Sequence, residues 1–459
     1  MRTLDQILTK KDYSRKTPAS LFYKDSPLWQ KLLTIGCVVF LSVAGLGEWK
    51  VLNGMLGGLP KAITLGVIGL AMLYTLFYPD EKRLREIWKP TLLYMSLMAV
   101  LFFWSVVIWI ESFATVSSMI RSCSKLVFQS IAILTAVALV YLFREKAIEL
   151  FTISICITNG AIMLLCIPEY GVGASIQSLV TCLVTFGDAV GYARQLEIHD
   201  LTFVFGQMIL YYAVFAPRTT RQEKRKRWLY LLLCCWFFLV GMKRSAIPAV
   251  LLFILIGLLL RKRKVSGRLY PALGVCCILF FLVFLYCVRY GIISRLLNSF
   301  GIDMMGRDYL WSMANPYYEF SVTYLGHGFE YVDTIISQWY DAGLINQPFP
   351  FHNDILKVFV EMGFPGFLLW SGIQYVLTPL FWQRYADQQT ALLYMCELGY
   401  MTVTYLTDNT AFYFWSAMAL RLVPLAYAME RKKPPEPKVW MPDSRQEMRD
   451  RIRILMQEG

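Results

Sequence analysis

Apolar runs long enough to enter a lipid bilayer recur along this 459-residue sequence. A helix needs about 20 apolar residues to cross the hydrocarbon core, and runs of about 15 to 20 residues occur about twelve times here. Backbone polar groups inside a bilayer must be bonded within their own segment, so each run is predicted to be helical. The expected fold class is all-α, a polytopic integral membrane protein. The predicted spans are 31–47, 62–78, 91–110, 126–143, 147–167, 201–216, 228–242, 247–260, 270–288, 364–382, 390–406 and 411–428.

Composition supports the same class. The chain is 57% hydrophobic and 17% charged, whereas about a quarter of the residues in a soluble protein are charged. A net charge of +13 would suggest nucleic acid as the partner of a soluble chain. Here the position of the charges matters more than their sum, so we expect membrane lipids as partners and no nucleic acid. The eleven cysteines lie mostly inside apolar runs without a CxxC pair, so neither a disulfide framework nor a cysteine metal site is predicted.

The distribution of positive charge predicts the orientation of the chain. With the N-terminus inside, about three quarters of the 45 Lys and Arg residues fall in inward-facing segments. Residues 168–200 and the long segment 289–363 then face outward. The expected organisation is a cytoplasmic segment 1–30, nine helices in 31–288, the outward-facing loop 289–363, three helices in 364–428 and a cytoplasmic tail 429–459. Residues 1–30 show no cleavable signal pattern.

The loop 289–363 is too long for a connector and too aromatic for a disordered linker. Its aromatic side chains could pack it into a small helical cap, or could stack on sugar rings. Its carboxylates are scattered and form no Asp-x-Asp pair. Because Mg²⁺ needs clustered oxygen ligands, we predict no metal site there.

One of the three histidines of the chain, His352, stands at the end of this loop. Asn353 and Asp354 are residue types that begin helices, and an apolar run follows, so His352 is predicted in the first turn of a short helix. Helical spacing places Asp354, Lys357 and Glu361 on one stripe, where they would form ion pairs with each other rather than with the histidine. Glycines and a proline at 363–366 are predicted to break this helix before the next span.

Ordered motifs over about residues 230–400 resemble the O-antigen ligase and O-antigen polymerase family of polytopic membrane glycosyltransferases. The pattern at 352–366 is His-Asn, a Leu three residues after the Asn, then Glu-x-Gly-x-x-Gly. Upstream, 306–311 (Gly-Arg-Asp-Tyr-Leu-Trp) and 325–329 (Leu-Gly-His-Gly-Phe) resemble the Gly-Arg...Trp and Gly-x-Gly elements of that family. Residues 241–246 (Gly-Met-Lys-Arg-Ser-Ala) resemble its Ser-Arg-Gly-type element.

The resemblance implies an enzyme without cofactor that acts on the outer face of a bacterial cytoplasmic membrane. Its donor would be a polyprenyl-pyrophosphate-linked glycan and its acceptor a glycan or lipid hydroxyl, with other polysaccharide-assembly proteins as possible partners. His352 would be the catalytic base, since an ordinary histidine pKa lies near neutrality. Arg244 and Arg307 would bind the pyrophosphate through their planar guanidinium groups. The further candidates for substrate binding are Lys243, Asn353, Glu361, His327 and His199.

Each of these residues has a structural alternative. Arg244 could extend to lipid headgroups, Arg307 could pair with Asp308, and His352 could be an interfacial histidine of no catalytic importance. A charged group at 194–200, which includes His199, could bind acceptor or cap the following helix.

The alternative function is a flippase for lipid-linked oligosaccharides or another transporter. Glu397 and Arg421 lie near the middle of adjacent predicted spans, and we expect them to form an ion pair.

Overall fold

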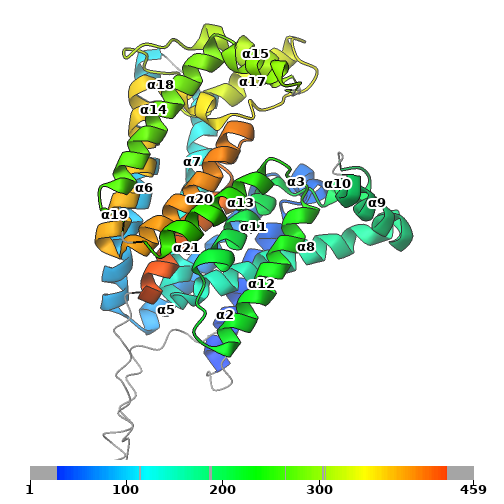
Figure 1. Cartoon of the computed structure of the whole chain (residues 1–459), viewed down its shortest axis with the longest axis vertical. Helices are drawn as coiled ribbons and strands as arrows, with labels where there is room; N and C mark the ends of the chain where they lie inside the picture. The colour runs from blue at the N-terminus through cyan, green and yellow to red at the C-terminus, as the bar shows by residue number, and fades with distance from the viewer. Residues whose placement is uncertain are drawn as a thin grey trace, which may run out of the picture.

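The computed structural model describes residues 28–112, 115–185, 189–263, 265–301, 304 and 306–431, and these residues contain helices but no strand. The all-α class is therefore confirmed for the described part of the chain (Figure 1). The helices are α2 (Leu28–Leu46), α3 (Lys50–Leu56), α4 (Leu59–Ala62), α5 (Leu65–Phe77), α6 (Glu81–Ser112), α7 (Val116–Phe143), α8 (Lys146–Tyr170), α9 (Val172–Thr185), α10 (Tyr192–Gln195), α11 (His199–Leu210), the π-helix η2 (Tyr211–Phe215), α12 (Arg221–Val240), α13 (Ala246–Arg261), α14 (Leu269–Arg289), α15 (Ile292–Ser299), α16 (Arg307–Ala314), the 3-10 helix η3 (Asn315–Tyr317), α17 (Tyr331–Asp341), α18 (Asp354–Ser371), the π-helix η4 (Gly372–Leu377), α19 (Thr378–Tyr385), α20 (Gln388–Thr407) and α21 (Phe414–Arg431).

Seven helical segments in the described ranges are long and apolar enough to cross a membrane, so this is a membrane protein. They are Leu28–Leu46, Leu59–Phe77, Glu81–Ser112, Val116–Phe143, Lys146–Tyr170, Leu269–Arg289 and Asp354–Tyr385. Seven of the predicted spans coincide with these segments. The other five do not coincide with a helix that is both long and apolar enough; they lie at 201–216, 228–242, 247–260, 390–406 and 411–428. The predicted count of about twelve spans is therefore not confirmed.

Helices α11 and α21, which cover two of these five predicted spans, are enclosed by the rest of the protein. Every residue of α11 from Asp200 to Leu210 is buried, and so is α21 from Phe414 to Met429. Helix α21 packs against α7 and α11, and α20 packs against α13 and α19 (Figure 1). Because an all-round apolar helix can lie in a protein core or in a membrane span, hydropathy alone does not decide which of the two these helices are.

The segment 289–363 contains helices α15, α16, η3 and α17, which gather at one end of the molecule next to α14 and α18 (Figure 1). Its aromatic side chains form much of its core. Trp339 is 5% exposed and lies between Tyr317, at 5.8 Å between ring centroids, and Phe351, at 6.2 Å. Tyr340 and Phe349 remain exposed. Packing, the first of the two uses considered, therefore accounts for most of these residues.

Backbone contacts join this segment to α18 at the predicted helix break. Gly363 has φ 63°, which interrupts the helical geometry inside α18. The amide of Phe364 donates to the Tyr324 carbonyl at 2.8 Å, and the amide of Gly328 donates to the Glu361 carbonyl at 2.7 Å. A side chain on Gly363 would lie 2.2 Å from the Leu325 carbonyl carbon. Only glycine allows this close approach of the two backbones, so the predicted helix break is confirmed. The backbone groups freed by the break form hydrogen bonds with the loop.

Glu397 and Arg421 do not pair, and that prediction was wrong. Both carboxylate oxygens of Glu397 are buried and have no hydrogen-bond partner among the described residues. The guanidinium of Arg421 instead lies over the Tyr94 ring, 5.9 Å from its centroid. Adjacent helices and similar depth do not fix which way two side chains point, and here the aromatic face is the nearer partner of the cation.

Candidate active site

His352 lies immediately before helix α18, outside its first turn. Asn353 is the residue that caps the helix, because its Oδ1 accepts the amide of Leu356 at 3.0 Å. His352 has φ 50°, a left-handed conformation that histidine tolerates better than most residues. The indole of Trp311 donates to the carbonyl of Phe351 at 2.8 Å and holds the preceding residue. These contacts leave the His352 side chain 24% exposed.

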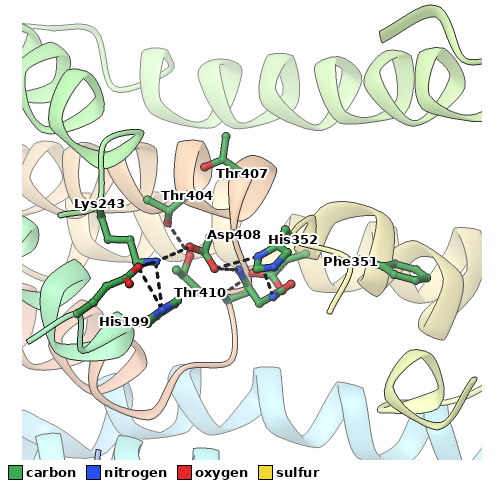
Figure 2. A network of polar contacts seen from close by, with 12 residues as sticks. His199, Lys243, Phe351, His352, Thr404, Thr407, Asp408 and Thr410 are labelled. Carbon is green, nitrogen blue, oxygen red and sulfur yellow. Dashed lines mark hydrogen bonds and ion pairs between the residues drawn. The ribbon is translucent and has the colours of Figure 1, made fainter. Parts of the chain in front are cut away.

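Asp408, at the C-terminal end of α20, is the acidic partner of this histidine (Figure 2). Its Oδ1 lies 3.4 Å from Nδ1 of His352, and the Asn409 amide nitrogen lies 3.5 Å from the same atom. Burial alone would raise the pKa of Asp408. The hydrogen bond from His352 and the charge of Lys243 outweigh burial and lower that pKa to about 2. Asp408 is therefore a carboxylate at neutral pH.

Lys243 connects Asp408 to a second histidine (Figure 2). Its ammonium lies 3.8 Å from Oδ2 of Asp408, 3.0 Å from Oε1 of Glu197 and 3.3 Å from Nε2 of His199. Burial and the nearby Lys243 charge lower the pKa of His199. The side chains of four residues thus form one continuous line of polar contacts, which runs from His199 through Lys243 and Asp408 to His352. The network joins the start of α11, the turn before α13, the end of α20 and the start of α18.

The segment 408–416, which carries Asp408, is fixed by side chains from three other helices. The amide of Ala411 donates to Asp354 of α18 at 2.7 Å. Gln129 of α7 donates to the Phe412 carbonyl at 2.6 Å. Asp200 of α11 accepts the amides of residues 415 and 416 at 2.9 Å each and so caps α21. These bonds hold the Asp408 carboxylate in place before any substrate binds.

Two cavities lie beside this segment. The larger, of about 420 Å³, is lined on one side by His199 and Glu197. The smaller, of about 180 Å³, is lined by Phe351, which precedes His352 in the sequence, and by Asn409, which lies next to His352 in space. Phe412 and Tyr413 line both. The polar network therefore runs beside two cavities that share Phe412 and Tyr413 in their linings.

Comparison with known protein families identifies the central part of the chain. Residues 229–371 match the family model described as O-antigen ligase. The chain carries an O-antigen ligase domain. The resemblance seen in the sequence motifs is thereby confirmed, and it implies a glycosyltransferase-type reaction with a lipid-linked glycan and a glycan acceptor as substrates. Among curated proteins, none matches this chain.

The O-antigen ligase domain contains seven of the eight residues proposed from the sequence; His199 lies before it. Lys243 joins the network with His352, as described above. Arg244 follows Lys243 and is exposed. Arg307 begins α16, one helical turn before Trp311, so both lie on the face of α16 that meets Phe351. Its guanidinium forms no hydrogen bond or ion pair with the described residues, Asp308 included. Neither arginine lines the two cavities.

Asn353 and Glu361 are fully buried, with 0% exposure, and line neither of the two cavities. Glu361 accepts the amide of Val332 at 3.1 Å and lies 3.7 Å from the Lys357 ammonium. The predicted pairing of Lys357 with Glu361 is thus present. Asp354, the third member of that stripe, bonds to residue 411 instead. Neither Asn353 nor Glu361 is exposed to make the substrate contact that was predicted from the sequence.

His327 is part of the loop core. Its ring stacks on Tyr331 at 4.2 Å, and its Nε2 bonds to the Tyr317 carbonyl at 2.8 Å. Burial lowers the pKa of His327. It therefore lies among loop residues and not with His352 in the network. Within the described ranges, no three His, Cys, Asp or Glu side chains gather to hold a metal ion.

Asp408 is the site residue that sequence reasoning missed. It stands 56 positions after His352 and beyond residue 371, where the family match ends. One signal was available. The triplet Asp408-Asn409-Thr410 interrupts two apolar runs, and the orientation predicted for the spans would place it on the same side as His352.

Proposed function

We propose that this protein is a membrane glycosyltransferase that polymerises or ligates polyprenyl-pyrophosphate-linked oligosaccharides during assembly of a surface polysaccharide. The proposal places the reaction on the outer face of a bacterial cytoplasmic membrane, with both termini in the cytoplasm and residues 289–363 facing outward. The observation that carries it is the pairing of His352 with ionised Asp408 at 3.4 Å beside a cavity, in a membrane protein with an O-antigen ligase domain.

His352 acts as the general base in this proposal. With Nδ1–H donated to Asp408, the lone pair of Nε2 is available to take the proton of an acceptor hydroxyl. The acceptor oxygen then forms a bond to the anomeric carbon of the donor sugar. The bond from that carbon to the phosphate oxygen breaks, and the polyprenyl pyrophosphate leaves as an anion. Asp408 stabilises the imidazolium formed during transfer, so its charge favours the transition state over the ground state.

Arg244 and Arg307 bind the leaving pyrophosphate. Two observations support this role: Arg244 is exposed, and the partly exposed Arg307 has a guanidinium that forms no hydrogen bond or ion pair with the described residues. A planar guanidinium can donate two parallel hydrogen bonds to phosphate oxygens, which a lysine ammonium cannot. Two such groups would offset the charge of the leaving group without a divalent metal, so the proposal includes metal independence.

The remaining candidates position the site. Lys243, which also contacts His199, holds the Asp408 carboxylate. Asn353 fixes the start of α18, and Glu361 and His327 fix the loop against that helix. The burial of Asn353 and Glu361 supports this assignment over direct contact with substrate.

One assay tests both pyrophosphate binding by the two arginines and metal independence. It measures transfer by purified protein from a lipid-linked donor in excess EDTA. Full transfer is expected in EDTA. Arg244→Lys and Arg307→Lys are expected to lose at least about tenfold in rate despite keeping the charge, since each loses a charged hydrogen bond. Arg85→Lys, at an exposed pair on α6, is the matched control. Activity that disappears in EDTA and returns with Mg²⁺ would contradict the arginine account.

A transporter for lipid-linked glycans is the second candidate function. One observation favours it: the carboxyl group of Glu397 is buried in α20 with no hydrogen-bond partner in the described ranges, and an ionisable group among membrane helices is often functional. Removal of this group distinguishes the two candidates and is considered below.

A further inference from the structure

The two cavities beside the His352 network share three lining residues. These are Lys125 of α7 together with Phe412 and Tyr413 of the segment 408–416. The smaller cavity reaches the neighbours of His352, and the larger one extends away from it toward α3, α4 and the start of α11. A chain-like ligand could therefore place one end near His352 and lie with the next residues in the larger cavity.

The carboxylates that line the larger cavity are already engaged by protein groups. Glu48 pairs with Lys61 at 3.1 Å, and Glu197 pairs with Lys243 at 3.0 Å. Asp200 accepts two backbone amides at the start of α21. None of these acids is left to attract a cation from solution.

Two lysines on the wall of the larger cavity keep donors for a ligand. Lys125 forms no hydrogen bond or ion pair with any residue in the described ranges. Lys50 donates to the Arg194 carbonyl at 3.0 Å, which uses one of its three N–H donors. The acids on the far side of Lys125 are engaged elsewhere, because Asp333 bonds to Lys357 at 2.7 Å and Asp354 bonds to the Ala411 amide at 2.7 Å. Lys125 and the two remaining N–H donors of Lys50 are therefore left on the cavity wall for an anionic ligand.

Size and lining match a sugar unit. A volume of about 420 Å³ falls in the usual range of small-molecule sites, about 300–1,000 Å³. Phe128, Phe412 and Phe414 line the cavity, and Phe128, which is only partly buried, is the ring on which a pyranose can stack. Gln129, which holds the Phe412 carbonyl, fixes the shared wall.

We infer that the larger cavity is a subsite for a glycan bearing an acidic group, a carboxylate or a phosphate, recognised by Lys50 and Lys125. The inference rests on the proposed function, since the glycan held there would be the acceptor presented to His352. It adds that this acceptor, or the growing chain, carries negative charge within one or two sugar units of the reacting hydroxyl. A neutral glycan of the same size would leave both ammonium groups without an anion.

Direct binding tests this without transfer. The full-length protein in neutral phosphatidylcholine nanodiscs is titrated with a tetrasaccharide of alternating glucuronic acid and N-acetylglucosamine, with a sugar phosphate, and with neutral chitotetraose. The acidic probes are expected to bind at least tenfold more tightly than chitotetraose. A Lys50→Ala, Lys125→Ala double variant is expected to lose at least about tenfold in affinity, since each lost charged hydrogen bond contributes about that factor. Lys262→Ala, exposed after α13, is the matched control.

The two acidic probes separate the sources of the charge, because tighter binding of one identifies a sugar acid or a sugar phosphate. The inference is overturned if neither acidic probe binds better than chitotetraose, or if the double variant binds them as the parent does. It is also overturned if a short-chain anionic phospholipid binds there and the acidic sugars do not compete. His352→Ala should bind the acidic probes normally, so loss of transfer in that variant cannot be mistaken for failure of the subsite.

Discussion

Asp408→Asn tests the central pair because the amide keeps the shape of the side chain and removes its charge. The substitution leaves Lys243 paired with Glu197 at 3.0 Å, so the remainder of the network should stay in place. During transfer, however, the protonated His352 would lack the anion that lies 3.4 Å away in the parent protein. Two unit charges at such a separation interact by about 4 kcal/mol at an effective dielectric of about 20. We therefore expect a 10²- to 10³-fold fall in the rate of glycan transfer.

The effect on stability should be smaller and depend on pH. Folding lowers the pKa of Asp408 from 3.8 to about 2, a difference that corresponds to about 2 kcal/mol. Because the folded value is the lower one, this stabilisation is present in full above about pH 4 and is lost as the pH falls toward 2. Asp408→Asn should thus lower the melting temperature at pH 7, and the difference from the parent should shrink as the pH falls from 4 toward 2.

The assay is transfer from a lipid-linked donor, run well below the melting temperature of both proteins, together with thermal unfolding at several pH values. Asp341→Asn, exposed at the end of α17, is the control for loss of one carboxylate charge. The reasoning fails if folded Asp408→Asn protein transfers glycan within about threefold of the parent rate. It also fails if the control loses as much activity.

His352→Ala should lower transfer by about 10² to 10⁴ with little change in melting temperature, because the side chain is 24% exposed; near-normal transfer would remove the histidine from the mechanism. Gly363→Ala should lower the free energy of unfolding by at least about 2 kcal/mol more than Gly343→Ala. Both have positive φ, but only at Gly363 would the new carbon meet the Leu325 carbonyl, at 2.2 Å; equal melting temperatures would contradict this account of the junction. Glu397→Gln should keep full transfer activity, whereas abolished glycan export in a protein that still transfers in vitro would favour the transporter.

Local signals in the sequence predicted the parts of the site that depend on neighbouring residues. Asn353 marked the start of a helix, and the glycines near 363 marked its break, because capping and left-handed φ are properties of single positions. His352 stood out by its rarity and its motif. Asp408 could not be paired with it by the same means, since that contact depends on how α20 returns to α18.

Burial explains the other differences. Asn353 and Glu361 belong to the motif that resembles the family, but a motif does not distinguish a residue that contacts substrate from one that holds the backbone. Glu397 and Arg421 were predicted to pair because both lie near the middle of adjacent predicted spans. That position does not determine which way each side chain points around its helix axis. The five unconfirmed spans are apolar, but hydropathy cannot tell a helix surrounded by protein from one surrounded by lipid.

The two segments that lie beside His352 differ in how firmly they are held. Residues 408–416 are bonded to three helices, so little conformational freedom remains there to be lost when a glycan binds. The segment 342–350, which leads directly to His352, is exposed along most of its length, with Ile345 as its buried anchor. Of these two segments, 342–350 is the one that can move aside for a polymer. Sequence changes in 342–350 would then alter how fast long chains exchange, while the chemistry at His352 and Asp408 would stay the same.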